Sequence, residues 1–568
     1  MKEASKNWEN KVLEEQKELS VSWIFEEIIR KRGLTDDFLN PKYLSQPEIF
    51  QKMPDMARAV ELILATISKQ EKILVYGDYD VDGVTATTLM VEALKLAGAK
   101  EVETMLPDRF IDGYGMSRRA VEEATSRQVK LVITVDCGSN NSEVIKELKQ
   151  AGILTIVTDH HEVMGELPEA EAIVNPKRTD LTEEEQVAIK EAGLCDLAGV
   201  GVAFMVALAL VAAGKIRQGQ EKWMLDLVLV GTLCDAMRLT KINRELTYYG
   251  AKVLAKTRRV GLKELMRVAG VTKVSAEAVG FQIGPRLNAG GRMESAEISL
   301  QLLMAESKAE ATRLAEELNE LNAGRRAEQN TAIQEIEEKC RAELAQPVIV
   351  VAGEWHEGVV GIIAGRLVEK YKRPAFALTK AGESGGIYKG SGRSFGEFNL
   401  AEMIKACSEV LVGGGGHAGA CGVKVAAGQV EQFRKRVNHY YESLNLENQE
   451  RFLAVEAEVL AENLNDFTEE LLEELATLEP FGGSNQEPVF ELSRMKIIEV
   501  RGVGKEGKHL RAVITDEMGR KMTLIAFSAP EEWLAIQPMT EVSVKVQLMR
   551  NEWNGRVSVE GRILEINY

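Results

Sequence analysis

Short apolar runs alternate with amphipathic stretches from residue 72 onward, and this alternation restricts the possible fold more than any other feature. The run from Lys72 to Tyr76 predicts a strand, and after the loop GDYDVDG at 77–83 a helix is expected from about Val84 to Ala97. A second strand is expected from Val102 to Leu106, with a helix near Ser117. Repeated strand-to-helix units of this kind favour an α/β fold built on a parallel sheet.

Acidic or imidazole side chains follow three of the predicted strands. The first strand leads into Asp78, Asp80 and Asp82. The run KLVITV at 130–135 leads into Asp136, and the run ILTIVT at 153–158 leads into Asp159, His160 and His161. Ligands of open parallel sheets bind beyond the carboxyl ends of the strands, so we expect these side chains to converge.

Five aspartates at one place would repel one another unless cations neutralised them. Oxygen ligands with an added imidazole favour Mn²⁺, with Mg²⁺ or Zn²⁺ as alternatives. A shared carboxylate is able to hold two ions roughly 3.5–4 Å apart, the arrangement that hydrolyses phosphate esters by activating water and stabilising phosphate charge. The sequence therefore predicts a site for two metal ions.

Each of these elements also has an ordinary explanation. An acidic turn such as DYDVD is often a solvated loop or a Ca²⁺ site, and a single aspartate after a strand, such as Asp136, is more often a helix N-cap than a ligand. A pair of histidines in an acidic loop is equally open to either interpretation. Their occurrence at the ends of successive parallel strands favours the metal site over these alternatives.

The same segments resemble the motifs of the DHH phosphoesterase superfamily. The first three motifs are matched by VYGDYDVDGVTAT at 75–87, TVDCG at 134–138 and VTDHH at 157–161, and the fourth by GTLCDAMRLTKINR at 231–244, which contains Asp235. Further segments resemble the RecJ family in particular: LPDRFIDGYG at 106–115, IVNPKR at 173–178, LAGVGVAF at 197–204 and GPRLNAGGR at 284–292. This resemblance implies an exonuclease that degrades single-stranded DNA from its 5′ end and releases 5′ mononucleotides.

The composition changes along the chain and predicts several domains. The expected divisions are an N-terminal helical segment at 1–70, a parallel-sheet DHH catalytic domain at 71–295, a long helical connector at 296–345, a second α/β domain at 346–445, and a β-barrel at 453–568. The second α/β domain contains KGSGRS at 389–394 and GGGGHAGACG at 413–422, and it resembles the DHHA1 substrate-binding domain. The barrel resembles an oligonucleotide-binding (OB) fold.

The resemblance to RecJ also implies individual roles for residues of this chain. Metal ligands would be Asp80, Asp82, Asp136, His160 and Asp235. Catalytic or supporting roles would belong to Asp78, Asp159 and His161, with Arg286 and Asn288 near the scissile phosphate. Arg109, Ser391 and Arg393 would bind the 5′ phosphate, and Gly415, Gly416 and His417 match the DHHA1 signature. The alternative for each arginine is a surface ion pair, and glycine-rich loops often have no ligand.

The C-terminal segment carries features that suit single-stranded DNA. Strands of alternating apolar and polar residues are expected, with a hairpin at Asn554-Gly555. A basic strip is predicted from Lys496, Arg501, Lys505, Lys508, His509 and Arg511. Trp553 or Phe527 is available to stack on bases. The alternative is that Phe527 belongs to the core and that the charges are merely solvated.

Charge and composition limit these interpretations only weakly. The net charge of −17 disfavours DNA binding, although metal-site carboxylates contribute to it and a local basic groove remains possible. The most apolar run, Val202 to Ala213, is too short to cross a bilayer. The charged N-terminus and six cysteines without paired spacing predict a cytoplasmic protein with free thiols.

The predicted partners follow from the resemblance alone. They are single-stranded DNA, a RecQ-type helicase and a single-stranded DNA-binding protein, and the chain is expected to be a monomer without membrane association. Two alternatives to the exonuclease remain: a DHH phosphoesterase for short RNA or small nucleotides, and a non-catalytic DNA-binding scaffold. The long chain with its barrel argues against the first, and the complete set of carboxylates argues against the second.

Overall fold

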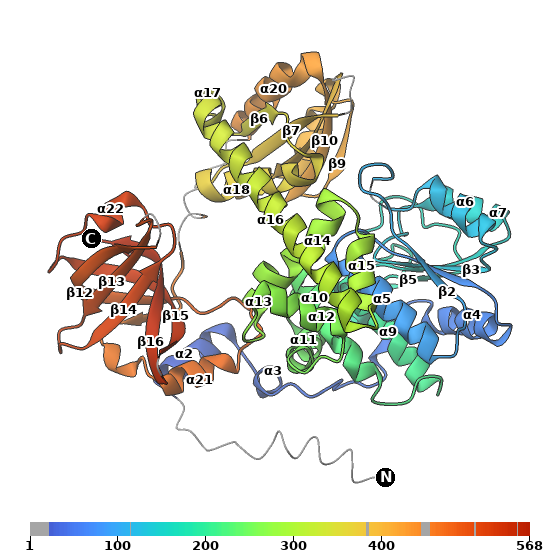
Figure 1. The fold of residues 1–568 in the computed structure, drawn as a ribbon, viewed down its shortest axis with the longest axis horizontal. Helices are drawn as coiled ribbons and strands as arrows, with labels where there is room; N and C mark the ends of the chain where they lie inside the picture. Colours follow the sequence, from blue (N-terminus) through green and yellow to red (C-terminus); the bar gives the residue numbers. More distant parts are fainter. Residues whose placement is uncertain are drawn as a thin grey trace, which may run out of the picture. The chain divides into compact units, whose positions relative to one another are not determined.

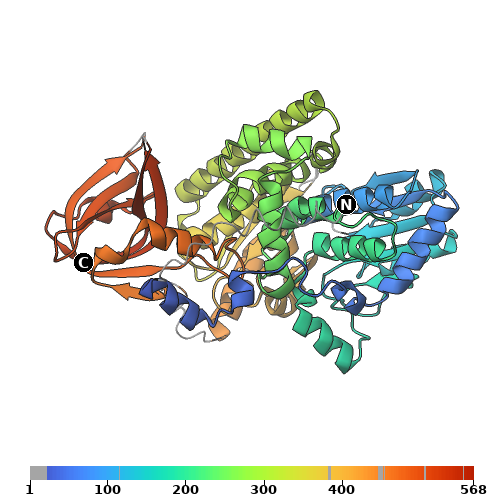
Figure 2. The same cartoon turned by 90° about the horizontal axis from the view of Figure 1, so that it is seen from below.

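The computed structural model describes residues 22–113, 115–381, 386–444, 452, 455–504, 507–553 and 555–568. Their contacts define two compact units. The larger unit contains residues 42–454 with 482–485, and the smaller contains residues 1–41, 455–481 and 486–568. Figures 1 and 2 show the helices and strands of both units.

The larger unit begins with the predicted parallel sheet. Its strands are β1 (Ile73–Tyr76), β2 (Val102–Met105), β3 (Leu131–Val135), β4 (Leu154–Thr158) and β5 (Ala172–Val174). They lie in the order β2-β1-β3-β4-β5 and every neighbouring pair is parallel. The prediction of an α/β fold is confirmed, and the strand order reverses direction between β1 and β3.

Helices cover both faces of this sheet because successive strand residues point to opposite sides. On one face Ile73, Val75 and Val135 pack against α4 (Met56–Ser68), α5 (Val81–Leu96) and α9 (Gly199–Ala212). On the other face Leu74 and Val132 pack against α6 (Arg118–Ser126) and α7 (Ser142–Gln150). Helix α5 begins at Val81, earlier than the predicted Val84, because the Asp80 side chain caps it by accepting a hydrogen bond from the Gly83 amide.

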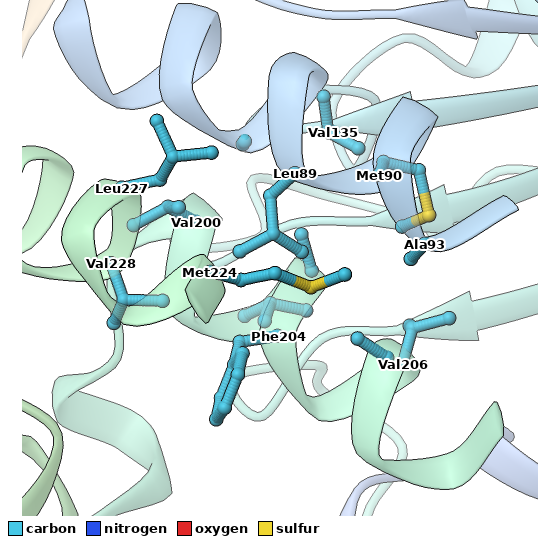
Figure 3. Packing of buried hydrophobic residues seen from close by; sticks show 14 of the residues in the cluster. Leu89, Met90, Ala93, Val135, Val200, Phe204, Val206, Met224, Leu227 and Val228 are labelled. Carbon is cyan, nitrogen blue, oxygen red and sulfur yellow. The ribbon is translucent and has the colours of Figure 1, made fainter. Parts of the chain in front are cut away.

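Two helices in the centre of this unit are apolar on almost every side. Helix α9 is buried from Gly199 to Leu210, and α10 (Leu225–Cys234) packs beside it. Figure 3 shows Leu89 of α5, Phe204 of α9 and Leu227 of α10 converging on one another. The apolar run noted in the sequence is thus a core helix. Among the residues that the structure describes, no helix is long and apolar enough to cross a membrane.

The remaining helices of the larger unit lead to the second sheet. They are α8 (Glu183–Ala192), α11 (Lys241–Leu254), α12 (Val260–Ala269), α13 (Ala276–Ala278), α14 (Gly284–Met293), α15 (Glu297–Met304), α16 (Lys308–Lys339) and α17 (Arg341–Leu344), with a π-helical segment at Val279–Ile283 before α14. Helix α16 has 32 residues and is the predicted connector; Gly324 does not interrupt it. The upper part of Figure 1 shows α16 running toward the second sheet.

The second sheet is mixed. Its strands are β6 (Ile349–Gly353), β7 (Ala375–Ala381), β8 (Ile387–Arg393), β9 (Gly413–Gly416) and β10 (Ala420–Ala426), in the order β6-β7-β8-β10-β9. Only β6 and β7 are parallel. Helix α18 (Val360–Tyr371) packs on one face, and α19 (Leu400–Ala406) and α20 (Val430–Ser443) pack on the other.

The smaller unit is a β-barrel with attached helices. Its strands are β11 (Val459–Ala461), β12 (Phe490–Val503), β13 (His509–Thr515), β14 (Lys521–Ala526), β15 (Glu541–Trp553) and β16 (Arg556–Asn567), and pairing of β12 with β15 closes the last five into a barrel. Strands β15 and β16 form the predicted hairpin, although Asn554 lies outside the described residues.

The predicted N-terminal helical segment is shared between the two units. Helix α2 (Trp23–Arg32) buries Ile24 and Ile28 against α21 (Glu469–Ala476) and the barrel, and the short α3 (Asp36–Leu39) follows it. Helix α4 instead packs on the first sheet, as noted above. The structure does not describe residues 1–21.

Candidate metal centre and substrate cavity

The acidic loop after β1 lies where the strand order of the first sheet reverses. Ligands of open α/β sheets bind at such a point, beyond the carboxyl ends of the two strands concerned. Here those ends carry Asp78, Asp80 and Asp82 from β1 and Asp136 from β3. The topology thus brings together the first two acidic motifs.

Asp82 is fixed by the amino end of helix α9. Its Oδ2 accepts a hydrogen bond of 2.6 Å from the Gly199 amide, and its Oδ1 accepts one of 2.9 Å from the Val200 amide. The amino end of a helix carries partial positive charge, so it favours the carboxylate form. Gly199 lies so close to Asp136 that a Cβ atom there would be 2.5 Å from the Asp136 Cβ. Glycine is therefore required at position 199.

Asp136 is turned toward the same point by an unusual backbone conformation. Its φ of 62° lies in the left-handed region that few residues other than glycine adopt, and its amide donates to the Thr158 carbonyl at 3.0 Å. Backbone conformations of this kind are common at functional sites, where the surrounding structure maintains them.

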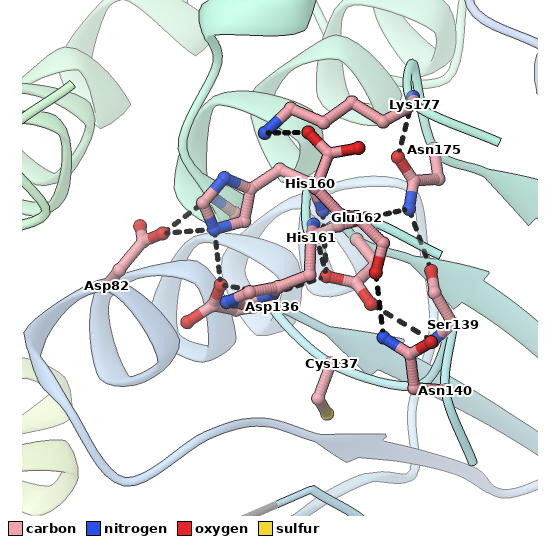
Figure 4. A network of polar contacts seen from close by, with 12 residues as sticks. Asp82, Asp136, Cys137, Ser139, Asn140, His160, His161, Glu162, Asn175 and Lys177 are labelled. Carbon is pink, nitrogen blue, oxygen red and sulfur yellow. Dashed lines mark hydrogen bonds and ion pairs between the residues drawn. The ribbon is translucent and has the colours of Figure 1, made fainter. Parts of the chain in front are cut away.

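Asp159 has a supporting position rather than one open to a ligand. Its oxygens accept hydrogen bonds from the amides of Ser139 (3.0 Å) and His160 (2.7 Å), and one of them lies 2.8 Å from His161 Nδ1. Asn175 extends this network by donating to Ser139 Oγ and to the His161 carbonyl (Figure 4). These contacts fix the His161 ring and the backbone of His160.

His160 lies at the centre of the carboxylates. Its Nε2 is 3.1 Å from Asp136 Oδ1, 3.7 Å from Asp235 Oδ2 and 3.8 Å from Asp82 Oδ2. Figure 4 shows the ring directed at Asp82 and Asp136. Three overlapping sets have ligand atoms within 4.8 Å of one another: Asp136, His160 and His161; Asp82, His160 and Asp235; and Asp78, Asp80 and Asp136. All the predicted metal ligands are thus brought together.

The pKa values reflect charges crowded into a buried place. Burial and the charge of Asp80 raise the pKa of Asp82 to about 7, while burial and the charge of Asp82 raise that of Asp235 to about 8. Burial and neighbouring carboxylates also raise the pKa of Asp78 and Asp136. Such carboxylates ionise together only when a cation compensates them.

The pKa values of the two histidines and of Asp159 shift in different directions. Burial lowers the pKa of His160 to about 3, so its imidazole is neutral, the form that binds metals. Burial opposes protonation of His161, but the hydrogen bond with Asp159 prevails and raises its pKa to about 9. Burial likewise opposes ionisation of Asp159, yet the contact with His161 lowers its pKa.

These residues suit divalent cations. Within the described part of the chain, Asp136 Oδ1 and His160 Nδ1 are buried and lack a hydrogen-bond partner, and the approach of His160 to Asp136 is not aligned as a hydrogen bond. A buried polar atom without a partner is costly unless something else binds it. Carboxylates with one neutral imidazole form a donor set for Mn²⁺ or Mg²⁺.

A cavity of about 900 Å³ adjoins this cluster and extends to the second sheet. Its lining includes Asp80, Arg109 and His161 from the first-sheet part, and Ser391, Arg393, Gly415, Gly416 and His417 from the second sheet and the turn after β9. Arg393 Nη1 donates to Ser391 Oγ at 2.8 Å, and Arg109 lies over the Tyr79 ring, 5.1 Å from its centroid. All six residues expected to bind substrate thus lie at one cavity with the acidic cluster.

Arg286 and Asn288 do not line this cavity. Arg286 donates from Nε to Asn319 Oδ1 at 2.9 Å and from Nη1 to the Gln282 carbonyl at 2.7 Å. Asn288 lines a separate cavity of about 220 Å³ together with Cys234 and Arg325. Their predicted place near a scissile phosphate stays a prediction.

Arg292 is a functional candidate that the sequence analysis missed. It lines the smaller cavity, and burial together with the charges of Arg109 and Arg325 lowers its pKa to about 10. The charge of Asp80 also acts on it, so it lies near both the acidic cluster and Arg109. It closes the motif GPRLNAGGR, and Asn175 lies in the motif IVNPKR, so both were within segments already recognised.

In the barrel, the ring of Phe527 is 61% exposed and contacts His509 edge-on at 5.7 Å. The alternative that Phe527 belongs to the core is therefore wrong, and stacking on a base stays a prediction. Lys496 is exposed and Arg501 lies 3.7 Å from Glu499. Lys505 and the side chain of Trp553 lie outside the described residues.

Three family models match the chain in succession. The DHH family N-terminal domain matches residues 72–232, the DHHA1 domain matches 345–443 and the RecJ OB domain matches 460–565. These spans agree with the first sheet, the second sheet and the barrel.

Several curated proteins are similar over most of the chain. The single-stranded-DNA-specific exonuclease RecJ of Bacillus subtilis (strain 168) is 36% identical over 557 residues, covering 96% of this chain and 68% of that protein. The protein of the same name from Escherichia coli (strain K12) is 32% identical over 541 residues, covering 90% of each.

Solved structures show the same architecture. RecJ of Thermus thermophilus in complex with Mn²⁺ matches with a TM-score of 0.80 and 29% identity, over 96% of this chain and 76% of that one. RecJ from the same organism in complex with Mg²⁺ matches with a TM-score of 0.74 and 27% identity, over 96% and 75%.

Proposed function

Because the chain belongs to the RecJ family of single-stranded-DNA-specific exonucleases, we propose that it removes 5′ mononucleotides from single-stranded DNA, in recombination and repair. The observation that supports this most directly is the shared cavity. Arg109, Ser391 and Arg393 line it together with Asp80 and His161. A nucleotide whose 5′ phosphate contacts the two arginines would therefore also lie beside the acidic cluster.

The acidic cluster is the proposed binding site for two metal ions. Asp80, Asp82, Asp136, His160 and Asp235 would hold two divalent cations, Mn²⁺ or Mg²⁺ as in the related structures. When bound, such ions supply activation of water at neutral pH and neutralise charge on the phosphate. Asp159 holds His161 through Nδ1, so that its ring orients the phosphate at the edge of the cavity.

The 5′-phosphate group accounts for the direction of degradation. Guanidinium groups bind a phosphate dianion through paired hydrogen bonds, and the Ser391 hydroxyl adds another donor. Water attacks the first phosphodiester, the bond from phosphorus to the 3′ oxygen breaks, and that oxygen takes up a proton. The released nucleotide keeps its 5′ phosphate, and the shortened strand carries a new 5′ phosphate, so Arg109 and Arg393 meet the same group again.

The proposal is tested with single-stranded oligonucleotides labelled at the 5′ or the 3′ end, beside the matching blunt duplex, with Mn²⁺, Mg²⁺ or chelator. We expect immediate release of a labelled mononucleotide from the 5′ end, a shortening ladder from the 3′ label, and no reaction with the duplex or with chelator. Asp136→Ala should abolish hydrolysis.

Other outcomes would contradict the proposal in distinct ways. Loss of the 3′ label first would overturn the direction. Activity restricted to dinucleotides would favour a phosphoesterase for small nucleotides, against which the barrel matched by the RecJ OB domain argues. Tight binding without cleavage under either metal would favour a scaffold.

The interaction partners and the cellular location are separate proposals. We propose action beside a RecQ-type helicase and a single-stranded DNA-binding protein, as a monomer in the cytoplasm. The six cysteines of the chain are all free, which suits a reducing compartment. Pull-down of the purified helicase and DNA-binding protein by the tagged chain, with and without DNA, tests the partners.

A further inference from the structure

Two strongly exposed apolar side chains lie at the cavity that contains the proposed active site. Ile111 is 81% exposed and Met164 is 70% exposed, and both line the cavity beside Arg109 and His161. A single exposed apolar residue is ordinary on a protein surface. Two such residues on separate loops of one cavity are less ordinary, because most ligand sites combine apolar walls with a few polar groups.

The loop that carries Ile111 is held in a fixed shape by two aspartates. Asp108 Oδ1 accepts hydrogen bonds from the amides of Phe110 (2.8 Å) and Ile111 (3.2 Å). Asp112 accepts one of 2.7 Å from the Asp108 amide and one of 2.6 Å from Arg119. Ile111 is thus presented without packing of its own, and the loop loses little conformational freedom when a ligand binds.

The loop that carries Met164 is held by one asparagine. Asn140 Oδ1 accepts a hydrogen bond of 2.7 Å from the Met164 amide, and Asn140 Nδ2 donates to the Glu162 carbonyl at 2.9 Å. Asn140 itself follows β3 and Met164 follows β4, so both ends of this contact are attached to the sheet that carries the acidic cluster.

Each of the two loops lies close in sequence to a residue that is proposed to contact a phosphate of the 5′-terminal nucleotide. Ile111 lies two residues after Arg109, which is proposed to bind the 5′ phosphate, and Met164 lies three residues after His161, which is proposed to orient the scissile phosphate. A 5′-terminal nucleotide has one phosphate at each of these places, because they flank the same sugar. Its base is then the part left to contact the apolar side chains that the two loops expose.

We propose that Ile111 and Met164 form the contact surface for the base of the 5′-terminal nucleotide, an inference that rests on the proposed exonuclease function. Neither side chain has a hydrogen-bond donor, and the methionine sulfur is only a weak acceptor. They therefore contact the apolar face of any base and do not distinguish base edges. Methionine also adapts its shape readily to different partners. The surface increases affinity for a nucleotide without imposing a sequence preference.

The experiment compares two 5′-phosphorylated single strands that differ only in the first nucleotide, one with a normal base and one with an abasic tetrahydrofuran residue. Release of the first residue is measured with Mn²⁺ for the wild type, for Ile111→Ala with Met164→Ala, and for Met164→Leu. Val187→Ala is the matched control, since Val187 is 55% exposed in the same unit and does not line the cavity.

The double alanine variant should raise KM for the normal strand about tenfold, the change that corresponds to about 1.4 kcal/mol of lost apolar contact. Its kcat should change little. The wild type should show a similar rise in KM on the abasic strand, with no further rise in the variant. Met164→Leu should retain most of the affinity, and Val187→Ala should match the wild type.

Two results would overturn the proposal. One is an equal loss by the double variant on both strands, which would place its effect on the fold or on the phosphates. The other is an unchanged KM for the normal strand. Failure of the wild type to release any nucleotide from either strand would overturn the exonuclease function itself, and the base contact with it.

Discussion

At the scale of single residues, the acidic cluster depends on contacts so close that they leave no space for a larger side chain. Gly199 illustrates this best, because its amide binds Asp82 while its missing side chain leaves space for Asp136. The neutral imidazole of His160 lies among buried carboxylates. Burial raises the pKa of one of them, Asp82, and so favours its protonated form. Arg109, Ser391 and Arg393 come from distant parts of the chain to one cavity.

Gly199→Ala should lower exonuclease activity on single-stranded DNA by about a hundredfold or more, because a displacement of about 1 Å at a catalytic group is enough for such a loss. The added Cβ would meet Asp136 at 2.5 Å. Titration of activity with Mn²⁺ measures the effect. Gly324→Ala is the matched control, since nothing lies within 4 Å of its Cβ position, and it should keep full activity. Normal activity of Gly199→Ala would contradict the geometry described.

Arg393→Ala should raise KM for a 5′-phosphorylated strand about a hundredfold, the order expected when a charge-assisted hydrogen bond is lost. The same strand with a 5′ hydroxyl should be affected much less, because it lacks the group that Arg393 is proposed to bind. Steady-state kinetics on both strands check this. Arg366→Ala serves as control, since Arg366 pairs with Glu369 on the outside of α18. An equal loss on both strands would argue against a phosphate-binding role.

At the scale of elements, three helices position the acidic cluster. The amino end of α5 carries Asp80 and Asp82, the amino end of α9 binds Asp82, and the carboxyl end of α10 carries Asp235. These helices pack on one another and on β3 through a continuous apolar core (Figure 3). The core therefore determines the distances between the proposed metal ligands.

Leu89→Ala should lower the free energy of unfolding by about 2–5 kcal/mol, the range for deletion of a buried leucine side chain. Leu89 is fully buried between α5 and its neighbours. Because the amino end of α5 carries two proposed metal ligands, the apparent Mn²⁺ affinity should fall as well. Urea denaturation followed by circular dichroism and Mn²⁺ titration measure the two effects. The control is Leu96→Ala at the end of the same helix, where the side chain is partly exposed. Equal losses in the two variants would contradict this account.

At the scale of the whole molecule, a net charge of −17 is compatible with DNA binding because basic side chains gather locally in the cavity beside the acidic cluster. Carboxylates gather at the metal centre, while Arg109, Arg292 and Arg393 lie around it. Metal binding, protonation and stability of the larger unit are consequently linked.

Stability of the metal-free protein should decrease as pH rises from about 4, the ordinary pKa of an aspartate, to about 7 and 8, and should level off above that. The pKa values of Asp82 and Asp235 are raised in the folded state, so their favourable contribution exists at low pH and is lost as they ionise. Saturating Mn²⁺ should remove this decrease and raise the unfolding free energy by about 2.7 kcal/mol at a hundred times Kd. Thermal denaturation from pH 5 to pH 9, with Mn²⁺ and with chelator, measures both. Asp136→Asn should be less sensitive to Mn²⁺, and an unchanged response would contradict the linkage.

The amino-acid sequence was enough to predict the α/β class, the parallel order of apolar strands and the convergence of Asp80, Asp82, Asp136 and His160. These follow from local periodicity and from the rule that parallel strands end at one edge, which need no knowledge of distant contacts. It also located the barrel, whose strands alternate apolar and polar residues.

Contacts between side chains that lie far apart in the sequence became known from the folded structure. Arg109 and Ser391 line one cavity although they lie far apart in the sequence. Arg286 turns to Asn319, whereas Arg292 lies near Asp80 and Arg109. The N-terminal helices divide between two units, and Phe527 is exposed. The physical reason is that side-chain rotamers and helix docking depend on packing partners supplied by remote segments, which local pattern does not specify.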